Sequence, residues 1–226
     1  MAKEPGKWID VKREKRETKD TQVTVSRQSI EIKRRGNPVH VEIEGAGLAY
    51  LLIDCSGSMS GGNLAQARQG AIDFAEGARV KGYAIGLISF ASTAEHLCLP
   101  QKNTASLRGH LERMTAAGST NMSDAIHLAT QNLVEQKGTR VIVIVTDGEP
   151  DSEGKTLAAA RKAKDHGIDI IAIGTDDANR TFLAKLATRS DLAVKVSRDR
   201  LGEAITSTTQ MLPRLGGSNS TLPGPS

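Results

Sequence analysis

An unbroken apolar run that ends in an aspartate constrains the fold of this chain more than any other stretch. Residues Leu48–Ile53 carry no polar side-chain group except the Tyr50 hydroxyl, which predicts a strand buried on both faces of a sheet. Asp54 follows at the carboxyl end of this strand, and Ser56 and Ser58 come next at alternating positions. Their carboxylate and hydroxyl oxygens are hard donors, which suit Mg²⁺, Mn²⁺ or Ca²⁺ better than zinc or copper. The stretch therefore predicts a cation site at a strand end.

Two further stretches supply donors for the same ion. A second apolar strand, residues 140–145, is followed by Thr146, Asp147 and Gly148, and a small polar loop at 117–121 contains Thr120. Sites in open α/β sheets form outside the carboxyl ends of the strands. If the two strands are neighbours, five side chains converge on one ion: Asp54, Ser56, Ser58, Thr120 and Asp147. We expect the Thr120 loop to be free to move and its hydroxyl to be exposed.

Strand and helix patterns alternate along the chain from about residue 45. The predicted strands are 48–53, 83–90, 94–99, 140–145, 168–174 and 192–196, and the predicted helices are 63–80, 106–114, 123–136, 153–165, 179–187 and 198–211. This alternation predicts an α/β fold with a doubly wound, Rossmann-like, mostly parallel sheet flanked by helices. Pro100 marks the strand before it as an edge strand.

The ends of the chain differ in composition from this region. Residues 1–20 form a charged arm of mixed sign that contains Trp8, the only tryptophan. Residues 21–44 alternate apolar and polar side chains. This alternation predicts a small β-hairpin appendage or meander with a turn at 35–38. Residues 45–212 then form the main domain, and the Gly/Ser/Pro-rich tail 213–226 is expected to be disordered. Whether Trp8 anchors a partner or docks on the domain stays open.

The three loops together resemble the metal-ion-dependent adhesion site, or MIDAS, of von Willebrand factor type A (VWA) domains. The resemblance rests on Asp54-x-Ser56-x-Ser58, on Thr120 in a loop that reads Gly-Ser-Thr, and on Thr146-Asp147-Gly148, and it covers residues 45 to 212. It implies a six-stranded sheet whose short strand near residue 94 is antiparallel at an edge. It also implies that the chain is of the intracellular bacterial type.

The resemblance further implies a role for each site residue. Ser56 and Ser58 would ligate Mg²⁺, or Mn²⁺ or Ca²⁺, directly, Thr120 would join in the high-affinity state, and Asp54 and Asp147 would act largely through waters. Neutral hydroxyl ligands leave the ion electron-poor, so that an Asp or Glu of a partner protein can complete its coordination. The expected function is non-enzymatic, metal-dependent protein binding, and family members of this type often work beside AAA+ ATPases or signalling complexes.

A metal-dependent hydrolase and a nucleic-acid scaffold are the alternative functions. A phosphatase of this fold class would need a second aspartate where Ser56 stands, and a hydrolase elbow would need glycine in place of Asp54. A nucleic-acid scaffold using the basic residues of the arm is an alternative, although acidic residues are interleaved and the net charge is only +4. The five histidines are scattered, and Asp176-Asp177 indicates a helix N-terminus or, less strongly, a second cation site.

The compartment is also predicted from the sequence. The first residues contain no apolar export segment, and no apolar run approaches the roughly 20 residues needed to cross a bilayer. Cys55 and Cys98 are too few for a disulfide framework and are expected to stay reduced. We therefore expect a cytoplasmic protein with no membrane contact.

Overall fold

A computed structural model describes residues 21–26, 29–34 and 47–215. The chain divides into two compact units between residues 43 and 44. In the first unit, β1 (Thr21–Ser26) and β2 (Ser29–Arg34) pair in antiparallel fashion. The predicted turn at 35–38, the strand segment after it, the arm with Trp8 and the tail from 216 lie outside the described residues. The domain boundaries drawn from the sequence therefore stay predictions.

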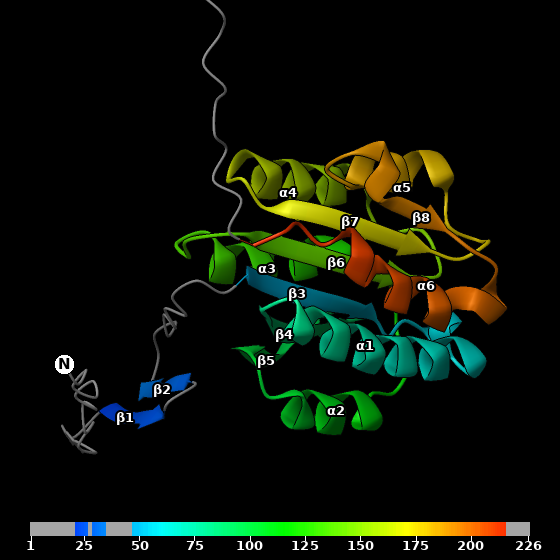
Figure 1. The fold of residues 1–226 in the computed structure, drawn as a ribbon. Helices are drawn as coiled ribbons and strands as arrows, with labels where there is room; N and C mark the ends of the chain where they lie inside the picture. Colours follow the sequence, from blue (N-terminus) through cyan, green and yellow to red (C-terminus); the bar gives the residue numbers. More distant parts are fainter. Residues whose placement is uncertain (1–20, 27–28, 35–46, 216–226) are drawn as a thin grey trace, which may run out of the picture. The chain divides into compact units, whose positions relative to one another are not determined.

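The second unit is built on one six-stranded sheet, as Figure 1 shows. Its strands are β3 (Gly47–Asp54), β4 (Tyr83–Phe90), β5 (Ala94–Gln101), β6 (Arg140–Thr146), β7 (Asp169–Gly174) and β8 (Ala193–Lys195). Their order is β5-β4-β3-β6-β7-β8, and only the edge strand β5 is antiparallel to its neighbour. The predicted α/β fold with a mostly parallel six-stranded sheet is confirmed.

The strand order places a topological switch point at the centre of the sheet. The chain leaves β3 toward β4 and β5 on one side, and then returns to β6 and continues to β7 and β8 on the other. All residues of β3 are buried, as are those of β6 after Arg140, because both strands are covered on both faces. Loops that follow β3 and β6 diverge to opposite faces, which leaves a crevice where ligands bind in folds of this kind.

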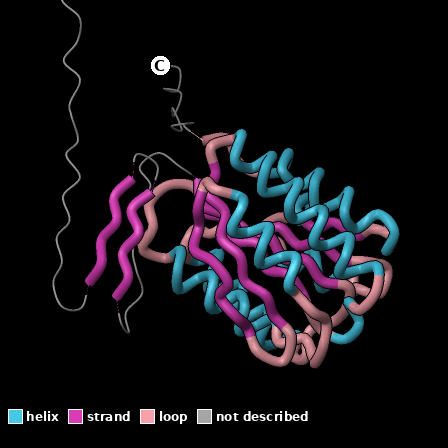
Figure 2. The backbone as a smooth tube through the Cα atoms, turned by 90° about the horizontal axis from the view of Figure 1, so that it is seen from below, coloured by secondary structure: helices cyan, strands magenta, loops and turns pink. Residues whose placement is uncertain are grey.

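Helices cover both faces of the sheet (Figure 2). α1 (Gly62–Val80) packs against α6 (Leu201–Ser207) and against α2 (Thr104–Arg113). α3 (Met122–Leu133) packs against α4 (Glu153–Asp165), which contacts α5 (Arg180–Leu186). The start of β6 is fastened to two of these helices by Arg140, whose guanidinium donates to the carbonyls of Val134 at 3.0 Å and of His166 at 2.8 Å. These carbonyls lie at the C-terminal ends of α3 and α4, where a cation is favourable.

The predicted last helix, 198–211, has the right bounds but is not one regular α-helix. The structure has a 3₁₀ turn at Arg198–Arg200, then α6, then a second 3₁₀ turn at Thr208–Met211. The hydroxyls of Ser207, Thr208 and Thr209 each donate to the carbonyl three residues earlier. Such side-chain bonds compete with the regular helical ladder, so the helix tightens and ends.

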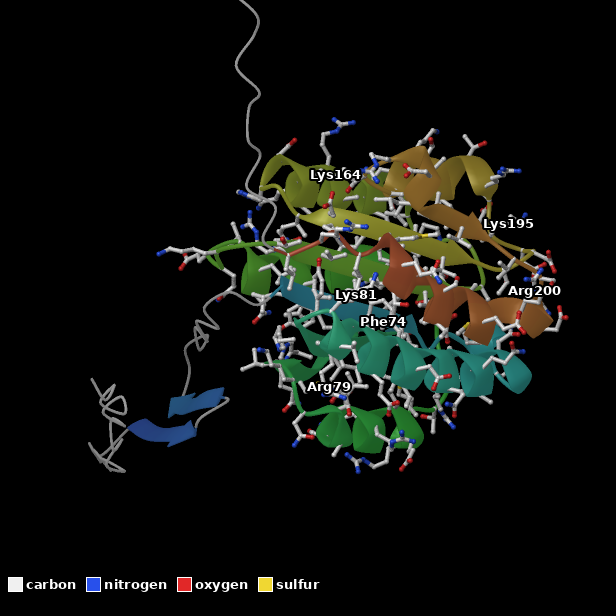
Figure 3. All side chains as sticks on the ribbon, in the orientation of Figure 1. Phe74, Arg79, Lys81, Lys164, Lys195 and Arg200 are labelled. Atoms are coloured by element: carbon white, nitrogen blue, oxygen red, sulfur yellow. The ribbon has the colours of Figure 1, made fainter. Side chains whose placement is uncertain are left out.

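The broken segment is nonetheless held firmly against α1. A Cβ atom on Gly70 would lie 2.6 Å from the carbonyl oxygen of Gly202, so the two helices can approach this closely because residue 70 is glycine. Lys81, just past the end of α1, donates through Nζ to the carbonyl of Thr209 at 2.6 Å (Figure 3). The contact between α1 and the segment that contains α6 therefore extends from the middle of α1 to its C-terminal end.

Candidate metal centre

Four of the predicted site side chains meet at the carboxyl edge of the sheet, beside the switch point. The Ser58 hydroxyl donates to Asp147 Oδ1 over 2.7 Å, and the Oγ atoms of Ser58 and Ser56 lie 3.0 Å apart. Asp54 is the last residue of β3, and its Oδ1 accepts the backbone N–H of Ser56 at 2.8 Å. The residues meet because β3 and β6 are parallel neighbours, so the chain leaves both strands at the same edge.

Asp54 is fully buried, and its environment does not balance its negative charge. Its Oδ2 accepts the hydroxyl of Thr146 at 2.6 Å. Burial raises the pKa of Asp54 above its usual range, the hydrogen bonds from Thr146 and Ser56 lower it, and the negative charge of Asp147 raises it again. Because burial is the largest of these effects, the ionised carboxylate is less well stabilised here than it would be in water.

Asp147 is also buried, and both of its carboxylate oxygens have donors. Oδ1 accepts from Ser58, and Oδ2 accepts the amide of Asn63 at 3.0 Å. The Asp147 carbonyl oxygen accepts the hydroxyl of Thr175 at 3.2 Å. Asn63 lies in the first turn of α1, so the orientation of this carboxylate is set by the loop after β3 and by the helix that follows.

Thr120 lies in the loop between α2 and α3, and the backbone of this loop is hydrogen-bonded to three neighbouring loops. Its backbone makes hydrogen bonds of 2.7–3.1 Å to the loops that follow β3, β4 and β6: Ala117 N–H to Cys55 O, Gly57 N–H to Gly118 O, Ser119 N–H to Ser92 Oγ, Thr120 N–H to Asp151 Oδ1 and Asn121 N–H to Ala91 O. Thr120 itself is only 9% exposed. The backbone of the loop is thus bonded at five points, while the mobility of the loop and the exposure of the Thr120 hydroxyl stay predictions.

The close packing of this loop requires glycine at residue 118. Gly118 has a φ of +86°, which side chains rarely adopt, and a Cβ atom here would lie 2.5 Å from Ser92 Oγ. The Ser92 hydroxyl oxygen in turn accepts the backbone N–H of Ser119 at 3.1 Å. The Gly-Ser-Thr sequence thus brings Thr120 to the edge of the sheet through contacts that only a glycine at the first position permits.

The residues present fit a hard divalent cation. Within residues 47–215, no Lys or Arg forms an ion pair with Asp54 or Asp147, although two buried carboxylates so close together are costly without a compensating charge. No group of three or more His, Cys, Asp or Glu side chains in the described part of the chain is placed to hold an ion. A cation at this site would therefore depend on the serine and threonine hydroxyls, together with the two carboxylates.

Three residues that contact this cluster were not predicted from the sequence as parts of the site. Thr146 donates to Asp54, Asn63 donates to Asp147, and Asp151 accepts from the backbone of Thr120. Thr146 was within the Thr-Asp-Gly motif, so its position beside Asp147 offered a signal. No signal in the sequence indicates Asn63 or Asp151, because their contacts depend on how α1 and the loop after β6 lie in three dimensions.

Asp177 and His96, which also drew attention in the sequence, are bonded to residues outside this site. Asp177 forms an ion pair with Arg198, and the N-terminus predicted for Asp176-Asp177 is instead capped by Asn179, whose side chain accepts the N–H groups of Thr181 and Phe182. His96 Nε2 lies 2.8 Å from the buried Tyr50 hydroxyl, and burial lowers the pKa of His96. Both cysteines are free thiols, and burial raises the pKa of Cys55 to about 11.

The fold and site define a class: doubly wound α/β domains with hydroxyl and carboxylate side chains gathered at the switch point. The chain belongs to the von Willebrand factor type A domain family, whose model matches residues 50–209. Two relatives are the UPF0353 protein of Mycobacterium leprae, 32% identical over 150 residues, and the human collagen alpha-6(VI) chain, 29% identical over 133 residues. These matches cover 57% and 56% of this chain but only 44% and 5% of the relatives' lengths.

Solved structures have the same fold. The vWF domain of the type V pili tip protein Mfa5 from Porphyromonas gingivalis superposes with a TM-score of 0.67 at 14% identity, over 78% of this chain and 99% of its own. Proximal thread matrix protein 1 from the mussel byssus, with a zinc-occupied MIDAS motif, gives 0.62 at 16% identity, over 78% of this chain and 49% of its own. Within the part of the chain that the structure describes, no helix has the length and apolar character of a membrane span.

Proposed function

We propose that this chain is a metal-dependent protein-binding module. A divalent cation held by Ser56, Ser58 and Thr120, with Asp54 and Asp147 behind them, would bind an Asp or Glu side chain of a partner. The observation that supports this most is the pair of buried carboxylates that no basic side chain compensates in the described residues. Neutral hydroxyls beside them would leave the ion able to attract one more anionic ligand.

The choice of ion follows from the donors. All five side chains offer oxygen, which favours Mg²⁺ or Mn²⁺, and Ca²⁺ after them. The zinc-occupied MIDAS of the mussel protein supports a divalent ion in this family without fixing which one this chain binds. We infer Mg²⁺ or Mn²⁺ because the site offers no thiolate or imidazole at the cluster.

A calorimetric titration tests whether the chain binds an ion. The purified full chain, stripped with chelator, is titrated with Mg²⁺, Mn²⁺ and Ca²⁺ at constant ionic strength, and its melting temperature is measured in parallel. We expect one bound ion per chain and a stabilisation of about 2.7 kcal/mol when the free ion exceeds its Kd a hundredfold. Absence of binding heat, together with identical melting in chelator and in millimolar Mg²⁺, would show that no resident cation exists.

The two alternative functions have less support. A serine nucleophile needs a base, yet the Ser56 and Ser58 hydroxyls contact each other and Asp147, and no His or Lys among the described residues bonds to either. The arm on which a nucleic-acid scaffold would depend lies outside the described residues. We therefore propose a non-enzymatic module, and a cytoplasmic location and an AAA+ ATPase or signalling complex as partner stay predictions from the sequence.

A further inference from the structure

A reciprocal contact joins Thr120 to the loop that carries Asp147. Asp151 Oδ1 accepts the backbone N–H of Thr120 at 2.9 Å, and the backbone N–H of Asp151 donates to the carbonyl oxygen of Thr120 at 3.0 Å. Asp151 therefore bonds both polar groups of the Thr120 backbone, and the Thr120 carbonyl also accepts the N–H of Met122 at 2.9 Å. Since two hydrogen bonds to the same residue restrict both translation and rotation, Asp151 restricts the position of Thr120.

Asp151 is the one charged group among the contacts that hold the backbone of residues 117–121 in the described structure. The other acceptors for N–H groups of this loop are the carbonyls of Cys55 and Ala91 and the hydroxyl of Ser92. Hydrogen bonds to an ionised acceptor are shorter and roughly twice as strong as bonds between neutral groups. Asp151 is exposed, so water screens its charge, and this contact differs from the others mainly because one residue bonds both polar groups of the Thr120 backbone.

Asp151 also couples two predicted ligands that come from different parts of the chain. It lies four residues after Asp147 in the loop that connects β6 to α4, whereas Thr120 precedes α3. A shift of the β6–α4 loop therefore moves Asp147 and Thr120 together. No other hydrogen bond between the Thr120 loop and the β6–α4 loop is described, so this pair is the hydrogen-bonded link between them.

We propose that Asp151 is a positioning residue that places the Thr120 hydroxyl for the cation and so sets the ion affinity of the site. The inference rests on the proposed function, because it concerns the same ion. Asp151 would act through the backbone of Thr120 rather than as a ligand. Substitutions in the shell around metal ligands typically lower metal affinity about 10- to 100-fold, and we expect Asp151→Ala to fall within that range.

The test is a titration of Mn²⁺ into four purified full-length proteins, with free Mn²⁺ measured by its electron paramagnetic resonance signal. Asp151→Ala removes the acceptor, and Asp151→Asn keeps a carbonyl oxygen that can accept the Thr120 N–H. Glu149→Ala is the matched control, since it removes an exposed carboxylate from the same loop, and no contact between Glu149 and residues 117–121 is described. Melting temperatures without metal are measured for all four.

The expected result is at least about a tenfold weaker Kd for Asp151→Ala, with Asp151→Asn and Glu149→Ala within about threefold of wild type. If Asp151→Asn binds Mn²⁺ nearly as well as wild type, the loss in Asp151→Ala comes from the missing hydrogen-bond acceptor and not from the missing charge. Equal Kd values for Asp151→Ala and Glu149→Ala would overturn the positioning role, and so would loss of affinity only in proportion to a lowered melting temperature. No Mn²⁺ binding by the wild-type protein would overturn the proposed function and this role with it.

Discussion

Asp147→Asn is expected to remove cation binding without weakening the metal-free fold. In the variant, the amide oxygen can accept from Asn63 and the amide nitrogen can donate to Ser58, so both hydrogen bonds of the native carboxylate are kept. The loss of one negative charge also relieves its repulsion of Asp54. We expect affinity for Mg²⁺ or Mn²⁺ to fall by more than about 100-fold, beyond the usual effect of a residue that only supports a ligand.

Melting with and without metal measures both parts of this expectation. In chelator, Asp147→Asn should melt at the wild-type temperature or above it, and in excess Mg²⁺ only the wild-type protein should gain stability. Asp176→Asn is the matched control, because Asp176 is an exposed acid that follows the neighbouring strand β7, and it should respond to metal as wild type does. A variant that melts well below wild type in chelator would show that Asp147 has a structural role in the fold.

Thr120→Ala is expected to abolish most partner binding at little cost in folding stability. The Thr120 side chain is buried, but its hydroxyl makes no hydrogen bond to the described residues, so its removal leaves no orphaned partner. Because the substitution removes one largely buried methyl group, the free energy of unfolding without metal should fall by about 1 kcal/mol or less. Affinity for an acidic partner should fall about tenfold or more, because the ion loses one of its few direct ligands.

A binding titration at fixed salt and millimolar Mg²⁺, with the partner purified after its capture, measures this loss. Thr115→Ala is the control, since Thr115 is an exposed threonine in the same loop and should bind as wild type does. Replacement of the partner's metal-binding Asp or Glu by its amide should reproduce the effect of Thr120→Ala, as a neutral amide is a weaker ligand for a hard cation. Normal binding by Thr120→Ala would remove this residue from the site.

The strands, and the place of most site residues, could be predicted from the sequence for one physical reason. Strands buried on both faces read as continuous apolar runs, so the polar residues that follow them, Asp54 and Asp147, stand out at the strand ends. Parallel neighbours then bring these ends together, as the short contact between Ser58 and Asp147 demonstrates. What the residues bind is a separate question, and their role as cation ligands stays a prediction.

The features of the site that the sequence does not predict depend on contacts between segments far apart in the chain. Asn63 and Thr120 owe their surroundings to the packing of α1 and of three loops, and nothing in local composition indicates that Asp151 accepts from Thr120. Nor does the sequence indicate that the small polar residues of the Thr120 loop fit closely against Ser92, because this contact too joins distant segments. The change from α-helix to 3₁₀ turn at the end of the last helix was not predicted, because it depends on side-chain hydroxyls that bond to backbone carbonyls.

Capture of partners by the immobilised full chain tests the central claim most directly. Wild-type protein and Asp147→Asn are each incubated with native lysate at constant ionic strength, in Mg²⁺ or in chelator, and the retained proteins are compared. The account predicts a partner that is retained only by wild type and only in Mg²⁺, and that is released when chelator is added. Retention of the same proteins by both chains in both buffers would contradict a cation that joins this domain to its partner.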